Sequence, residues 1–230
     1  MNKMREKIII GLAAFAGVLL AWNMNTIFTA LPDELNQGAI YRIIYFHVPA
    51  NILGMTGFGL GMLLSIGYLV TKDLRYDALA ASVTEVSLVF ASIGLATGSI
   101  WARIIWGVWW AWDYRLTSWL VCWLIFGGYL MLRRAVDEPN QRARFAAVVS
   151  ILGSVNAYIS YKSIEWWNTQ HPQPVLSIRN GGGMAAGMEA PIWWNLLALA
   201  CFSAILVMVR TRQEAIANEI DTLRRMAHAQ

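Results

Sequence analysis

Long stretches without charged residues divide this chain, and they limit its fold more than any other feature. Six runs contain at most one charged residue each: 8–30, 48–70, 78–100, 116–132, 145–161 and 191–209. Each is close to the roughly 17–25 residues that a helix needs to cross a bilayer. Only 14% of the residues are charged, whereas a soluble domain usually has about 25%. The sequence therefore predicts an all-α integral membrane protein, a single domain over residues 1–230 with six transmembrane helices.

The basic residues predict an orientation. Thirteen of the 18 Lys and Arg lie at the N-terminus, in the connections 71–77 and 133–144, or in the charged tail 210–230. Because positive charge is retained on the cytoplasmic side, both termini are predicted to be cytoplasmic. The outer loops are then 31–47, 101–115 and 162–190. A net charge of +4 distributed in this way indicates membrane topology rather than nucleic-acid binding. The first run exceeds the apolar core of about 7–15 residues in a signal peptide, so we expect a retained helix.

Tryptophan is concentrated on the predicted outer side. Ten of the 12 lie in or beside the outer loops: Trp101, Trp106, Trp109, Trp110, Trp112, Trp119, Trp166, Trp167, Trp193 and Trp194. An aromatic belt explains Trp193 and Trp194, which open the last run, but a belt is expected at both interfaces. Five Trp within residues 101–112 instead favour contact with a large, flat, apolar ligand, since indole rings stack on extended π systems.

The segment 103–113 carries the densest part of this cluster. If the segment is helical, four residues fall on one face at i, i+3, i+4 and i+7: Trp106, Trp109, Trp110 and Asp113. Such a helix would lie along the membrane surface. Asp113 either holds Trp or Arg side chains, or acts as a local helix cap or a partner of Arg115. Thr117 and Ser118 are suited to cap the fourth run.

Two of the three histidines lie on the same predicted side. His47 and His171 each stand beside aromatic residues and a proline, whereas His228 lies in the tail. A pair of imidazoles can occupy both axial positions of a haem iron. Without a carboxylate cluster, the pair is a poor zinc or iron hydrolase site. The two cysteines form no C-x-x-C-H motif, so covalent haem attachment is not expected.

Several polar groups leave their role open at this stage. Four outer arginines are available for two haem propionates, or are ordinary loop charges: Arg42, Arg103, Arg115 and Arg179. The Gly-rich segment 177–188 is a mobile lid or a plain connector, and Met184 or Met188 is a further candidate iron ligand. Glu85 lies within the third run and is a candidate functional residue. Alternatively, its side chain reaches the cytoplasmic interface or bonds to a neighbouring helix.

The run W-G-V-W-W-A-W-D-Y-R-L-T-S at residues 106–118 resembles the tryptophan-rich WWD signature of haem-handling membrane proteins. With six runs and one His in each flanking outer loop, the chain resembles the cytochrome c maturation protein C family over roughly residues 8–210. The larger synthase-type members of that superfamily have more helices and additional His.

This resemblance implies delivery of haem rather than turnover, hence no enzyme activity. It implies transient, non-covalent haem b at the periplasmic face of the bacterial inner membrane, with His47 and His171 as axial ligands. The implied platform consists of Trp106, Trp109, Trp110, Trp112 and Asp113, with Arg115 beside it. One implied partner is the periplasmic haem chaperone, maturation protein E. The others are an ABC-type pair, the ATPase (maturation protein A) and its membrane component (maturation protein B), and a small membrane protein (maturation protein D).

Two other functions fit the same residues. A respiratory subunit would pass electrons through a bis-His haem to quinone, but such proteins usually place His pairs inside facing helices. A haem transporter across the bilayer would be expected to carry polar or broken segments near the midplane, and Glu85 is the one candidate for such a feature.

Overall fold

The computed structural model of the chain describes residues 3–173, 184 and 187–228. Within these residues, six α-helices are long and apolar enough to cross a membrane, as predicted. They are α1 Lys3–Asn25, α2 Ile44–Thr71, α3 Leu74–Ile105, α4 Tyr114–Ala135, α5 Pro139–Trp166 and α6 Ala190–His228. A π-helical turn, η1 Thr26–Ala30, extends α1, and a 3-10 turn, η2 Ala39–Ile43, leads into α2.

Most helices extend beyond the predicted spans. The predicted spans end where charged residues begin, whereas a helix can continue past the hydrocarbon core into the charged segments. At the start of α2 this changes the position of a key residue. His47 lies in the first turns of α2, not in a loop as predicted. The charged Arg42 just before it is accommodated because its side chain donates hydrogen bonds to the carbonyls of Ile27 and Leu31 at 2.9 Å.

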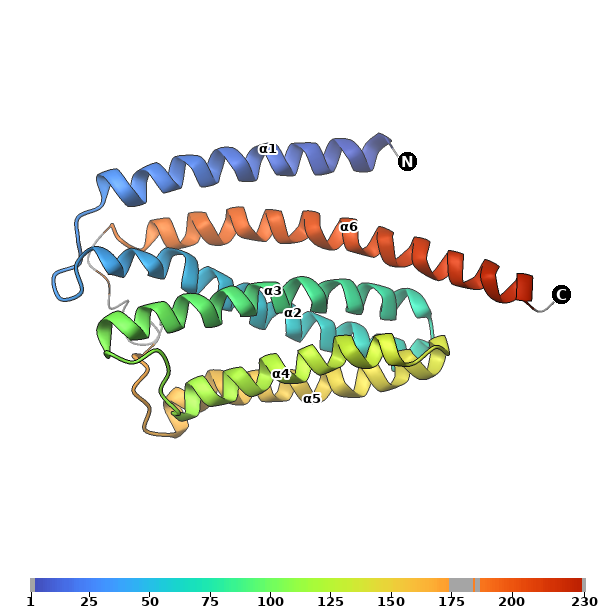
Figure 1. The fold of residues 1–230 in the computed structure, drawn as a ribbon. Helices are drawn as coiled ribbons and strands as arrows, with labels where there is room; N and C mark the ends of the chain where they lie inside the picture. Colours follow the sequence, from blue (N-terminus) through green and yellow to red (C-terminus); the bar gives the residue numbers. More distant parts are fainter. Residues whose placement is uncertain (1–2, 174–183, 185–186, 229–230) are drawn as a thin grey trace.

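The helices lie roughly side by side, with both termini at one end of the bundle (Figure 1). We call this end the termini end, and the opposite end, where α2 begins and α3 stops, the histidine end. Helices α2 to α5 share the main apolar core. There the rings of Phe58 and Phe126 stack 3.7 Å apart, and Gly153 lets α5 approach Phe126 so closely that a Cβ atom would come within 2.9 Å.

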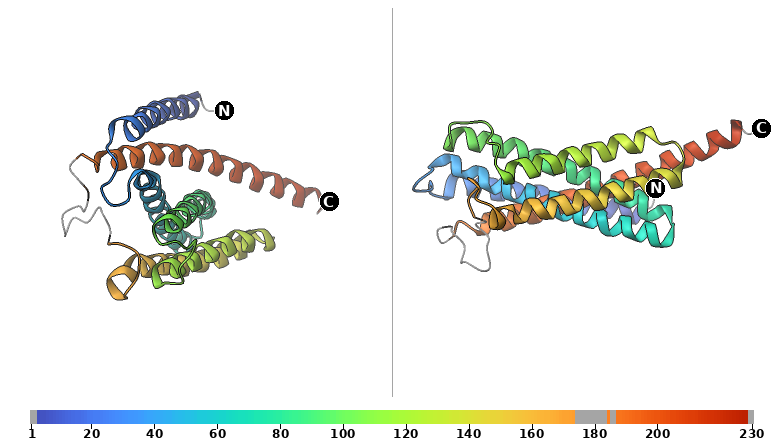
Figure 2. Two further views of the ribbon diagram at one scale, coloured as in Figure 1. Left: turned by 60° about the vertical axis from the view of Figure 1, so that its left-hand side comes forward. Right: turned by 90° about the horizontal axis from the view of Figure 1, so that it is seen from below.

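Helix α1 lies at the side of the bundle and packs on α6 (Figures 1 and 2). Of its residues, Ala16 and Asn23 are buried. The Asn23 amide donates to the Pro191 carbonyl at 2.9 Å and to the Asn195 side chain at 2.7 Å. Asn195 in turn donates to the Tyr45 carbonyl at 2.7 Å. These buried amides join α1, α6 and α2 near the histidine end.

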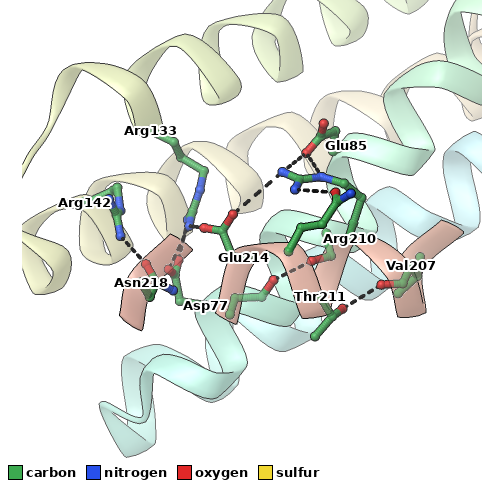
Figure 3. A network of polar contacts seen from close by, with 12 residues as sticks. Asp77, Glu85, Arg133, Arg142, Val207, Arg210, Thr211, Glu214 and Asn218 are labelled. Carbon is green, nitrogen blue, oxygen red and sulfur yellow. Dashed lines mark hydrogen bonds and ion pairs between the residues drawn. The ribbon is translucent and has the colours of Figure 1, made fainter. Parts of the chain in front are cut away.

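A network of ion pairs joins three helices at the termini end (Figure 3). Arg133 on α4 holds both carboxylate oxygens of Asp77 on α3, at 2.6 and 3.0 Å, and contacts Glu214 on α6 at 3.2 Å. Glu85 on α3 pairs with Arg210 on α6 at 2.6 Å. Of the alternatives for Glu85, the structure therefore shows the bond to a neighbouring helix.

The charged tail is helical but does not form a separate helix. Helix α6 continues for 39 residues to His228, which corresponds to about 58 Å at 1.5 Å per residue. A hydrocarbon core is only about 30 Å thick. The C-terminal part of α6 therefore projects beyond the other helices (Figure 1).

Candidate haem-binding site

The connection between α3 and α4 is irregular, and the predicted surface helix over 103–113 is wrong. Helix α3 ends at Ile105, and Gly107 follows with a φ of 76°. A right-handed helix cannot pass through a residue of positive φ. Arg103 reinforces the turn by donating to the Gly107 carbonyl. The tryptophans that follow are therefore presented by a loop rather than by one face of a helix.

The indole rings of this loop differ in exposure. Trp109 and Trp112 are 61% and 78% exposed, whereas Trp106 and Trp110 are partly buried. The rings of Trp110 and Trp112 meet edge to face with centroids 6.0 Å apart. The indole N–H of Trp110 is buried and has no hydrogen-bond partner among the described residues. The loop thus presents a large apolar aromatic surface.

Asp113 caps α4, which was one of the alternatives for this residue. Its Oδ1 accepts a hydrogen bond from the Leu116 amide at 2.8 Å, as expected of an N-cap carboxylate. The prediction that Thr117 or Ser118 caps this helix is wrong. The helix begins earlier, at Tyr114, and the Ser118 hydroxyl donates to the Tyr114 carbonyl within it at 2.6 Å.

The second oxygen of Asp113 reaches a different part of the chain. Its Oδ2 accepts hydrogen bonds from the Thr169 hydroxyl and, at 3.2 Å, from the Gln170 amide. The His171 amide then donates to the Thr169 hydroxyl oxygen at 3.2 Å. Nearby, the rings of Tyr114 and Trp167 stack with centroids 5.4 Å apart. The WWD segment and the segment that carries His171 are therefore joined.

The tautomer of His171 follows from its partner. Its Nδ1 lies 2.9 Å from the Pro172 carbonyl oxygen, which can only accept, so Nδ1 carries the proton and Nε2 keeps its lone pair. Burial lowers the pKa of His171, and the positive charge of Arg115 lowers it further, against the opposing effects of the Pro172 carbonyl and Asp113. The imidazole is therefore neutral near pH 7, the form that binds a metal.

His47 has the same tautomer for a different reason. Its Nδ1 lies 2.9 Å from the Thr97 hydroxyl oxygen on α3. The single hydroxyl proton of Thr97 is directed to backbone carbonyls of its own helix, with the Ile93 oxygen at 2.7 Å, so Thr97 accepts the Nδ1 proton of His47. The Nε2 atom of His47 faces the Asn51 amide at a longer distance of 3.3 Å.

Two glycines on α3 make room for this arrangement. A Cβ atom at Gly98 would lie 3.0 Å from Cε1 of His47, and one at Gly94 would lie 2.5 Å from the Asn51 side-chain oxygen. The ring of Trp101 meets the His47 ring edge to face at 5.7 Å. The sequence pattern did not single out Thr97, Asn51 or Trp101 for the site. Two features of the sequence could have indicated them: Gly94 and Gly98 have the spacing of small residues at a close helix contact, and Asn51 follows His47 by one helical turn.

His47, His171 and Arg115 lie toward the same end of the bundle. His171 and Arg115 both lie within electrostatic range of the His47 ring, and Arg115 also acts on His171. The Arg115 guanidinium donates to the Ser160 carbonyl on α5. Arg42 is bound to Asp33 and to carbonyls, and Arg103 to Gly107.

The remaining candidates lie in the third outer loop. Arg179 and most of the segment 177–188 lie outside the described residues. Met188 is buried in an apolar cluster, and Met184 packs against that cluster. In the described part of the chain, no group of three or more His, Cys, Asp or Glu is placed to hold a metal ion.

Membrane-length helices in a bundle, with two histidines and exposed indoles at one end, define a multi-pass membrane protein with a candidate ligand site at that end. The family model described as "Heme exporter protein C" matches residues 1–226. The chain therefore belongs to the heme exporter protein C family, whose members are membrane components of haem transport rather than enzymes.

Individual relatives agree with the family match. The chain is 35% identical over 216 residues to heme exporter protein C of Bradyrhizobium diazoefficiens, covering 94% of this chain and 81% of the relative. It is 34% identical over 209 residues to that of Paracoccus denitrificans, covering 90% and 84%. For the protein of Escherichia coli K12 the identity is 35% over 181 residues, covering 79% and 73%.

Proposed function

We propose that this chain binds haem at the histidine end, with His47 and His171 as the axial ligands, and delivers it to a haem chaperone for cytochrome c maturation. The observation that carries the proposal is that two imidazoles from separate segments lie at one end of the bundle, His47 in the first turns of α2 and His171 in the segment that Asp113 holds through Thr169. Each has its Nδ1 engaged by an oxygen acceptor. This leaves Nε2 as the ligating atom on both; on His47 that atom faces the Asn51 amide at 3.3 Å, which iron would displace. Such outer-shell contacts orient metal-ligating histidines.

The surroundings fit a porphyrin carried as cargo. The exposed rings of Trp109 and Trp112 offer faces on which a flat macrocycle can stack. Arg115, whose guanidinium is anchored to the Ser160 carbonyl and whose charge acts on both imidazoles, is suited to pair with a propionate carboxylate. Trp106 and Trp110 complete the aromatic loop, while Asp113 supports it through the α4 cap. Since neither Cys122 nor Cys201 stands in a C-x-x-C-H motif, the haem in this proposal is non-covalent haem b.

The position of the site favours delivery over electron transfer. The imidazoles lie where α2 begins and where α5 has already ended, rather than facing each other from mid-helix positions. A ligand at the end of the bundle is accessible to a partner outside the membrane. Two neutral imidazoles also hold iron reversibly.

The orientation and partners belong to the same proposal. The charge bias places the histidine end at the periplasmic face of the bacterial inner membrane. The relatives are named heme exporter proteins, which supports a place in an ABC-type complex. Its other members would be the ATPase (maturation protein A), the membrane component (maturation protein B) and the small membrane protein (maturation protein D). The periplasmic haem chaperone, maturation protein E, is the proposed recipient.

Purified protein titrated with haem tests the proposal. We expect the wild type to give a six-coordinate, low-spin optical spectrum, and the double variant His47→Ala/His171→Ala to lose it. His228→Ala is the matched control, because it removes the third histidine and should leave the spectrum intact. A double variant with an unchanged low-spin spectrum would refute the ligand assignment.

A further inference from the structure

The two imidazoles are held in very different ways, and we infer from this that His171 is the ligand that leaves the iron when haem is handed over. We further infer that a latch controls its departure. The latch consists of the Asp113 carboxylate with the Thr169 hydroxyl and the Gln170 amide. This inference rests on the proposed function, since it assigns an order of ligand release to the same site.

His47 is fixed in the helical bundle. It lies in the first turns of α2, and its Nδ1 is bound to Thr97 on α3 at 2.9 Å. Gly98 packs against its ring, and the Trp101 ring covers one edge. The Trp101 indole is itself held by the Gln37 side chain at 2.8 Å. To leave the iron, His47 would have to disturb the packing of two transmembrane helices.

His171 stands instead in an irregular segment between α5 and α6. Its own ring is bound only to the carbonyl of the next residue, Pro172, among the contacts of the described chain, so that bond moves with the loop. Among the described residues, the hydrogen bonds and ring contacts that tie the segment to the bundle run through Asp113 and the stack of Trp167 on Tyr114. Freeing His171 therefore requires no movement of a transmembrane helix.

The latch depends on one carboxylate that serves two segments. Asp113 Oδ1 caps α4, while Oδ2 receives two donors from the loop. Hydrogen bonds to a charged acceptor are stronger than neutral ones. The Thr169 hydroxyl passes the restraint on, because its oxygen also accepts from the His171 amide at 3.2 Å. Asp113 and Thr169 are thus positioning residues that act on the iron through His171.

Carbon monoxide provides a direct measurement, because it binds ferrous six-coordinate haem only after one axial ligand has left. We expect Thr169→Val to increase the CO-binding rate of the reduced, haem-loaded protein by about tenfold, the effect of losing roughly one hydrogen bond. Asp113→Asn should act in the same direction. Asparagine caps a helix as well as aspartate does, but its one oxygen is then used at the cap, and the NH2 group in place of Oδ2 cannot accept from the two loop donors.

Three controls separate the latch from general damage. Thr169→Ser keeps the hydroxyl and should restore the wild-type rate. Thr29→Val removes a hydroxyl at the same end that bonds only to the carbonyl of Asn25 at 2.6 Å, and should have no effect. In a His171→Ala background, Thr169→Val should produce no further acceleration, because the ligand through which it acts is gone.

The outcomes distinguish this inference from the proposed function. If the wild type gives no low-spin haem spectrum, the proposed function fails. If the wild type is low-spin but Thr169→Val and Asp113→Asn bind CO at the wild-type rate, only the latch is refuted. Acceleration that persists in the His171→Ala background would refute it as well, since the hydroxyl would then be acting elsewhere.

Discussion

Single protons decide the chemistry of the two histidines. Thr97 has one hydroxyl proton and directs it to its own helix, which leaves its oxygen as the acceptor for His47 Nδ1. For His171, the carbonyl oxygen of Pro172 is the acceptor for Nδ1. In both cases the neighbouring group selects the tautomer whose Nε2 can bind iron. The sequence shows which residues are histidines but not which of their nitrogens is free.

We expect Thr97→Val to weaken haem binding about tenfold or more, because removing an outer-shell partner of a metal-bound histidine typically has an effect of this size. Valine fills a similar volume but cannot accept the Nδ1 proton of His47. Equilibrium titration with haem measures the change. Thr97→Ser keeps the acceptor and should bind haem as the wild type does; equal affinity for all three proteins would show that Thr97 does not orient His47.

At the scale of helices, the site depends on how closely α2 and α3 approach each other. Gly94 and Gly98 lie one turn apart on α3, facing Asn51 and His47 on α2. Without Cβ atoms at these positions, the imidazole and the amide fit between the two helices. The pattern of apolar runs predicted both helices correctly, but it could not show which turns of α2 and α3 meet.

Gly98→Ala tests this contact. Alanine is the better helix former by about 1 kcal/mol, so the helix should not be weakened, but its Cβ would lie 3.0 Å from the His47 ring. We therefore expect an intact fold and a haem affinity reduced about tenfold, in line with a displaced metal ligand. Gly128→Ala on α4, where no atom lies within 4 Å of the added Cβ, is the control. Unchanged affinity in Gly98→Ala would show that the imidazole tolerates the contact.

For the molecule as a whole, the essential condition is that both imidazole-bearing segments lie on the same side of the membrane. The connection after α1 and the connection after α5 are each separated from both termini by an odd number of spanning helices. Both connections therefore lie on the side of the membrane opposite to the termini. The connections on the two sides also differ in charge, which predicts that the termini are cytoplasmic. The ion-pair network of Asp77, Arg133 and Glu214 lies at the termini end, which this prediction assigns to the cytoplasmic side.

Single cysteines introduced in place of exposed residues test this topology. Leu35→Cys and Gln173→Cys, in the first and third outer loops, should react with a membrane-impermeant maleimide in intact cells. Ala217→Cys, on the projecting part of α6, should react only after the membrane is opened. Labelling of Leu35→Cys and Gln173→Cys from opposite sides would mean that His47 and His171 cannot share one iron.

The sequence by itself determined the class of the protein and the number of its membrane helices, because the bilayer imposes long uncharged runs that can be read locally. It also pointed to His47, His171 and the tryptophan cluster as candidate site residues. Only the tertiary structure decided that residues 106–113 form a loop, that Thr97 and Asn51 surround His47, and that Asp113 holds the segment before His171. The physical reason is distance along the chain. Asp113 and Thr169 are separated by 56 residues, and such contacts depend on how whole helices pack rather than on local composition.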